Sequence, residues 1–255
     1  MNNHVDLRKL LEGWPYDPDD NVRVLQGTDG REIMQVRLPV GIEQYELEGR
    51  PDGQQPYGME TALEYHRAQL ARAKEGGKEA SFKLSPDECA ELFNEGVLYY
   101  YRYLHCFHVK DWKRTVRDTA RNLTLFDFVH RFARREEDRT HLEQWRPYLI
   151  RMNAVARAML ELEEGRHDQA LRVVREAAER LESLPPLDDP TFKFEQKRSL
   201  QALQELIAQI EKSRPVPEVE LLERELQQAV DAEEYERAAG LRDRIRNLRK
   251  KSAAR

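Results

Sequence analysis

Cysteine is scarce in this sequence, with Cys89 and Cys106 as the only two examples among 255 residues. Two thiols are too few for a disulfide framework or for a zinc site made of four thiolates. Long apolar runs are also missing: no stretch of 18 uncharged apolar residues occurs, so we expect no membrane span. The first residues lack the basic segment followed by an apolar one that is typical of a secretory signal. Together these absences predict a protein of a reducing cytoplasm.

Charged residues, in contrast, are abundant. They make up 35% of the chain against 40% hydrophobic residues, and 42 Lys+Arg with 47 Asp+Glu give a net charge of −5. The composition is polar but supplies enough apolar residues for a core, and the length fits one main domain with a small appendage. The charge is uneven, because residues 242–255 hold seven basic residues and one acid.

A small β unit is predicted for residues 1–58. Two segments rich in β-branched residues, 22–26 and 33–38, flank Asp29-Gly30. Asp-Gly between such segments favours a β-hairpin, because both residues tolerate the positive φ that the turn needs. Residues 42–47 could add a third strand, and a cluster of Gly and Pro then ends the unit.

Helical periodicity characterises residues 59–213. Ser85 followed by Pro86 and two acids is typical of a helix start, with a hydroxyl cap and Pro in the first turn. Pro215 and Pro217 interrupt the pattern, so residues 214–255 are predicted to be a linker and a separate module. The fold class is therefore mostly α, an antiparallel array of helical hairpins. Its predicted helices cover residues 59–74, 85–107, 111–135, 140–164, 170–184 and 192–213.

One part of this array, residues 151–184, resembles a tetratricopeptide repeat. Small residues occupy the close-packing positions Ala158, Ala170 and Ala177, and Gly165 lies at the turn between the helices. The large positions of the repeat are not met, and no second copy follows at the same period. A generic helical hairpin is the better interpretation, since fewer than three repeats rarely fold as a solenoid.

The last segment has two amphipathic stripes. The first includes Leu222 and Leu226, and the second begins at Tyr235, after a polar break at residues 231–234. Two short amphipathic helices joined in this way predict an antiparallel hairpin of the coiled-coil type, in which Ala238-Ala239 lets the backbones approach closely. A hairpin this small buries little apolar surface alone and tends to dimerise or dock.

This segment resembles the UVR motif of the B and C subunits of the bacterial nucleotide-excision-repair endonuclease. The motif also occurs in some Clp ATPases and in the activator of the protein-arginine kinase. The stretch from Tyr235 to Ile245 carries most of the resemblance, which covers about an eighth of the chain. The matching residues are Leu222, Glu223, Leu226, Ala229, Val230, Glu234, Tyr235, Glu236, Ala238, Ala239, Leu241, Arg242, Asp243, Ile245 and Leu248.

The resemblance implies a bacterial protein whose hairpin binds another protein. The partner could be a second copy, a repair subunit, a Clp ATPase or a kinase regulator. The family's catalytic parts have no counterpart here, because Gly76-Gly77-Lys78 lacks the upstream Gly and the hydroxyl of a phosphate-binding loop. The expected partner-binding residues are Leu222, Leu226, Tyr235, Ala238, Ala239, Leu241, Arg242, Asp243, Ile245 and Leu248.

Three other patterns have chemical alternatives. His105 and His108 could share a helix face and bind a metal, but two ligands without an evident third favour ordinary histidines at a helix end. Cys106 could be a nucleophile, although His105 beside it in sequence does not face it on a helix. The aromatic segment at residues 99–103 could stack on single-stranded nucleic acid, and a core role is favoured.

We therefore expect a non-enzymatic adaptor or regulatory protein with no cofactor, no metal and no membrane contact. The alternative is an accessory factor of excision repair that binds nucleic acid through the basic tail. Phosphate contacts would then come from Arg249, Lys250 and Lys251.

Overall fold

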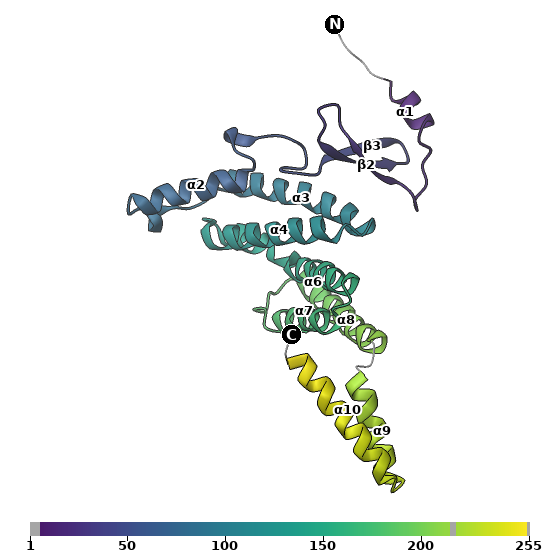
Figure 1. Ribbon diagram of the computed structural model, residues 1–255. Helices are drawn as coiled ribbons and strands as arrows, with labels where there is room; N and C mark the ends of the chain where they lie inside the picture. Colours follow the sequence, from purple (N-terminus) through teal and green to yellow (C-terminus); the bar gives the residue numbers. More distant parts are fainter. Residues whose placement is uncertain (1–5, 215–217, 254–255) are drawn as a thin grey trace. The chain divides into compact units, whose positions relative to one another are not determined.

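The computed structural model describes residues 6–214 and 218–253, and it describes side chains for residues 6–214 and 221–249. The chain forms two compact units, Met1–Ala208 and Gln209–Arg255. Helices dominate and a small antiparallel sheet precedes them, which confirms the predicted fold class (Figure 1). The main elements are α1 (Arg8–Glu12), β1 (Val22–Gln26), β2 (Glu32–Leu38), β3 (Gly41–Glu46), α2 (Ala62–Glu75), α3 (Pro86–His108), α4 (Trp112–Phe132), α5 (Glu136–His141), α6 (Arg146–Glu163), α7 (His167–Glu182), α8 (Pro190–Ser213), α9 (Glu218–Asp231) and α10 (Tyr235–Ala253).

The sheet has the strand order β1-β2-β3, and both pairs are antiparallel. The predicted turn joins β1 to β2, with Gly30 at φ 80° and the Gly27 N–H donating to the Arg31 carbonyl at 2.7 Å. One face of the sheet is apolar, and its buried Met34, Val36 and Tyr45 pack with Cys106 of α3. The sheet is thereby attached to the helices of the same unit through hydrophobic contact.

A buried arginine adds polar contacts to this attachment. Arg102 of α3 is 1% exposed and pairs with the equally buried Asp118 of α4, with Nε–Oδ2 and Nη2–Oδ1 distances of 2.7 and 2.9 Å. Its Nη1 donates to the carbonyls of Glu46, the last residue of β3, and of Gly49 in the following segment, at 2.7 and 2.9 Å. The N–H groups of a guanidinium need acceptors when it is buried, and here carboxylate and backbone oxygens accept four hydrogen bonds from it.

A second buried charge, Glu95 of α3, satisfies the start of α2. Its side chain is fully buried and accepts from the backbone N–H groups of Ala62 at 2.7 Å and Leu63 at 3.2 Å. These groups belong to the first turn of α2, where no intrahelical acceptor exists. Arg50 at 3.2 Å and Arg121 also donate to the Glu95 carboxylate. One carboxylate therefore connects α2, α3, α4 and the segment after β3.

In the first unit α3 packs on α4, α4 on α6, and α6 on α7. Among the described residues, no helix has the length and hydrophobicity needed to span a bilayer. Ser85 caps α3 as predicted and forms a capping box with Glu88. The prediction of one helix over residues 140–164 was wrong. α6 begins only at Arg146, because Pro147 in its first turn cannot continue a helix from the preceding residues.

The hairpin of α6 and α7 is the part that resembles a tetratricopeptide repeat. Ala158 and Ala170 are completely buried and Ala177 is nearly so, as expected for close packing of the two helices. Gly165 ends α6 at φ 71°, and the Gly165 and Arg166 N–H groups donate back to Leu162 and Glu161. This Gly is required by the left-handed conformation that terminates the helix.

Candidate functional site

The predicted hairpin is present, formed by α9 and α10 packed against each other. At the end of α9 the N–H of Glu233 donates to the Val230 carbonyl at 3.1 Å, and that of Glu234 donates to Ala229 at 2.8 Å. This pair of backbone hydrogen bonds ends the helix and reverses the chain. It requires one residue in the left-handed conformation, here Glu233 at φ 60°. The polar break of the sequence is therefore a tight interhelical turn.

The structure divides the ten predicted partner-binding residues into three groups. Leu222, Ala238 and Ile245 are at most 6% exposed and pack inside the second unit, so they stabilise the hairpin. The predicted apolar stripe is thus used largely by the hairpin itself, because two facing stripes bury each other. Half-buried residues flank these positions, and the remaining four are exposed. The half-buried residues are Leu226, Leu241 and Leu248, and the exposed ones are Tyr235, Ala239, Arg242 and Asp243.

Among the described side chains of the hairpin, Tyr235 is the most exposed large hydrophobic residue, with 69% of its surface accessible. It is the first residue of α10 and lies beside the turn. Leu221 at 46% and Val230 at 38% exposure are further apolar groups in contact with solvent. Partner binding by these surfaces stays a prediction, and Tyr235 is its best-placed anchor.

The basic residues predicted to contact phosphate are only partly described. Arg249 of α10 forms an ion pair with Glu223 of α9, with 2.5 Å between Nη2 and Oε1. This contact joins the two helices on an exposed surface, where such pairs contribute about 0–1 kcal/mol. The side chains of Lys250 and Lys251 lie outside the described residues.

The His-Cys cluster of α3 shows no geometry for metal binding or nucleophilic attack. His105 lies 3.8 Å from Glu43, and burial lowers its pKa. Among the described residues, no three His, Cys, Asp or Glu side chains are grouped to hold a metal ion. Cys106 is 1% exposed, and burial raises the pKa of its thiol to about 12, which leaves almost no thiolate near neutral pH.

The aromatic segment of α3 divides between core and cavity. Tyr99 and Tyr103 are buried, and Tyr99 donates from its hydroxyl to the Gly49 carbonyl at 3.2 Å. The ring centroid of Tyr100 lies 6.2 Å from that of Tyr148 of α6, and Tyr101 remains 45% exposed. The core interpretation therefore holds for Tyr99 and Tyr103, whereas Tyr100 and Tyr101, together with one side of Tyr103, contribute to a different feature.

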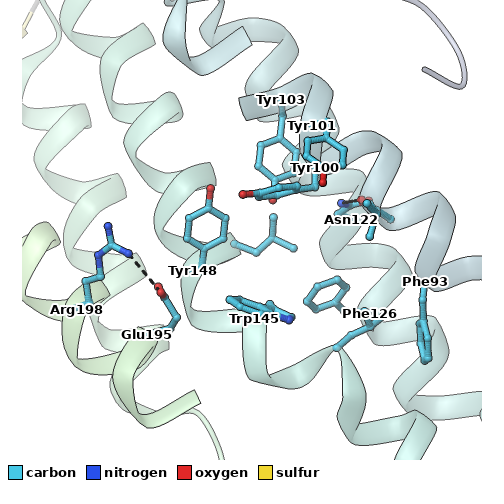
Figure 2. Close-up of a pocket in the computed structure, with 14 residues that line it drawn as sticks. Phe93, Tyr100, Tyr101, Tyr103, Asn122, Phe126, Trp145, Tyr148, Glu195 and Arg198 are labelled. Atoms are coloured by element: carbon cyan, nitrogen blue, oxygen red, sulfur yellow. Dashed lines mark hydrogen bonds and ion pairs between the residues drawn. The ribbon is translucent and has the colours of Figure 1, made fainter. Parts of the chain in front are cut away.

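That feature is a cavity of about 480 Å³ within the first unit, shown in Figure 2. Aromatic rings from three helices and from the turn before α6 dominate its wall, while Glu195 and Arg198 of α8 supply charges. Sequence reasoning missed this site, because its walls come from residues that are up to about a hundred positions apart. The lining residues are Phe93, Gly96, Val97, Tyr100, Tyr101, Tyr103, Asn122, Phe126, Leu142, Trp145, Tyr148, Leu149, Glu195 and Arg198.

The comparisons with known proteins concern the hairpin. Residues 218–251 match the family model of the UvrB/uvrC motif. This match covers α9 and most of α10 and confirms the UVR resemblance of the segment. No curated protein and no solved structure matches the chain. The UVR motif is a module for interaction with protein or DNA and is not catalytic in itself.

Proposed function

We propose that this protein is a non-enzymatic adaptor that binds a protein partner through its UVR hairpin, in the cytoplasm of a bacterial cell. The observation that carries the proposal is the match of residues 218–251 to the UVR motif together with the exposed Tyr235 beside the hairpin turn. A large, exposed ring at the end of a small helical hairpin has the properties of an interface anchor. Val230, in the last turn of α9, is a second exposed apolar side chain at this end of the hairpin.

The basic end of the chain supports nucleic-acid binding less well than protein binding. Arg249, one of the three residues predicted to bind phosphate, already forms an ion pair with Glu223. Phosphate binding by the hairpin would depend strongly on salt, whereas apolar docking around Tyr235 would change little between low and physiological salt. Salt dependence therefore separates the two functions.

Affinity capture with the full chain, followed by titration of each purified candidate partner, tests the proposal. Tyr235→Ala should weaken binding by about 2 kcal/mol, or roughly thirtyfold, because it removes a central aromatic anchor. Tyr16→Ala is the matched control, since Tyr16 is an exposed tyrosine of the other unit. Circular dichroism should show unchanged helix content in both variants.

A second variant carries Ala at Arg249, Lys250 and Lys251. On the adaptor hypothesis it should alter mainly the association rate and the salt dependence. If this variant abolished binding while Tyr235→Ala bound as tightly as the unmodified chain, the adaptor function would be refuted in favour of nucleic-acid binding.

A further inference from the structure

The cavity of the helical body contains a buried carboxylate with unused hydrogen-bonding capacity. Glu195 of α8 is 5% exposed, and its Oε1 accepts from Nη1 of Arg198 at 3.4 Å. Its Oε2 has no hydrogen-bond partner among the described residues, and the nearest cation is Nη2 of Arg151 at 3.7 Å. Buried carboxylate oxygens without a donor are rare, and here the residue that carries one also lines a cavity, so an N–H or O–H group of a ligand is the partner that the site lacks.

The charges around Glu195 restrict what that donor group can be. Arg151 and Arg198 both lie within 4 Å of the single carboxylate, so this end of the cavity already has an excess of positive charge. A cationic ligand would be repelled by the two guanidinium groups. An uncharged N–H donor, in contrast, would satisfy Oε2 without adding charge.

Arg198 adds a complementary requirement. Its side chain is 58% exposed, and Glu195 uses only part of its fork of five N–H donors. An acceptor next to a donor on the ligand would therefore meet Arg198 while the donor meets Glu195. A carbonyl adjacent to a ring N–H, the lactam edge of guanine or hypoxanthine, has this arrangement.

The rest of the wall suits a flat ring. Tyr100, Phe126, Trp145 and Tyr148 surround the same space in Figure 2, and their faces favour stacking on a planar heteroaromatic system. Trp145 remains 44% exposed, as expected for a ring at the entrance. The cavity volume of about 480 Å³ lies within the range of small-molecule sites and has room for a nucleoside.

Gly96 supplies an independent observation. It lies inside α3, where glycine weakens a helix relative to alanine, and it lines the cavity. A Cβ at this position would meet only Leu125 Cδ2, at 3.9 Å, beyond the backbone of its own helix. Packing within the chain therefore does not require glycine here, because 3.9 Å is an ordinary contact distance for a methyl group.

We propose that this cavity binds a planar heteroaromatic ring with a lactam edge, such as a guanine or hypoxanthine base. The ring stacks between the aromatic side chains, its N–H donates to Glu195, and its carbonyl accepts from Arg198. The base can come from a free nucleoside or from a single strand, and both sources present the same edge. The site lies in the first unit and is independent of the function proposed for the hairpin.

Calorimetric titration of the full chain with guanosine, inosine and adenosine tests this assignment. Guanosine and inosine should bind, and adenosine, which lacks the carbonyl, should bind at least tenfold more weakly. Glu195→Gln should weaken guanosine binding about tenfold, because a charge-assisted hydrogen bond is replaced by a neutral one. Arg198→Ala should reduce the preference for guanosine over adenosine.

Two further variants separate binding from folding. Gly96→Ala should reduce guanosine affinity without lowering the melting temperature, because Gly96 lines the cavity and alanine favours the helix. Phe194→Ala, on α8 but outside the cavity, is the matched control and should bind guanosine normally. Tyr235→Ala should also bind it normally, whatever happens to the adaptor function.

The source of the base is distinguished with tetranucleotides that contain one guanine or none. Tighter binding of the guanine-containing strand than of guanosine would assign the site to nucleic acid, and equal or weaker binding would assign it to the free nucleoside. The proposal is overturned if guanosine does not bind at millimolar concentration, if adenosine binds equally well, or if Glu195→Gln leaves the guanosine affinity unchanged.

Discussion

Replacing Glu95 by Ala should strongly destabilise the first unit, because this one carboxylate has four partners. Two of them, the backbone N–H groups of Ala62 and Leu63, would remain buried without an acceptor. Each unsatisfied buried group costs about 1–3 kcal/mol. The other two partners, Arg50 and Arg121, are 13% and 16% exposed, so water can only partly replace the lost carboxylate.

These contributions overlap, so the total is bounded by what the loss of one partner of a buried ion pair usually costs, about 3–5 kcal/mol. For a unit of this size that corresponds to a fall in melting temperature of roughly 6–20 °C. Glu95→Gln should have a smaller effect, since the amide oxygen can still accept one of the two backbone N–H groups. The start of α2 should lose its protection from hydrogen exchange first.

Urea unfolding followed by circular dichroism provides the measurement, with Glu91→Ala as control. Glu91 is also on α3, is 30% exposed, and contacts only side chains. We expect the control to lose less than about 1 kcal/mol. A Glu95→Ala variant with an unchanged urea midpoint would show that water reaches the α2 N-terminus, and the account of Glu95 as its buried acceptor would be refuted.

Two further predictions concern the hairpin turn and the thiols. Glu233→Gly should stabilise the hairpin by about 0.5–1 kcal/mol, because a φ of 60° is unfavourable for glutamate and is readily adopted by glycine. A lower midpoint of thermal unfolding in this variant would contradict the assigned turn. Both cysteines should resist alkylation at pH 8 in the native protein and react in urea, because burial raises the pKa of Cys89 to about 11 and that of Cys106 to about 12. Rapid native labelling would show that these residues open locally.

Sequence reasoning succeeded where the determinants are close together in the chain. The turn at Asp29-Gly30, the cap at Ser85 and the helix end at Gly165 each depend on a few adjacent residues with specific backbone preferences. The UVR hairpin was predicted for the same reason, because its two stripes and its polar break lie within about 30 residues. The error at residues 140–164 came from giving apolar periodicity more weight than Pro147.

The buried charges and the cavity could not be found in that way. Glu95 and Arg102 lie on a helix whose periodicity places charges toward solvent, and only the approach of α2, α4 and the segment after β3 gives them partners. For the aromatic segment of α3 the sequence favoured a core role. Its division into core and cavity depends on Glu195, almost a hundred residues away, which no local pattern connects with it.

The attachment of the sheet to the helices has a consequence for how this protein can vary. Arg102 binds the main-chain carbonyls of Glu46 and Gly49, and Arg117 donates to that of Leu47 at 2.6 Å. Carbonyl oxygens are the same for every amino acid, so these contacts recognise the path of the chain and are indifferent to its side chains. Substitutions in this segment that keep the positive φ of Gly49 and the buried side chain of Leu47 can therefore accumulate with little effect on the contacts, whereas insertion or deletion of a single residue would displace every acceptor at once.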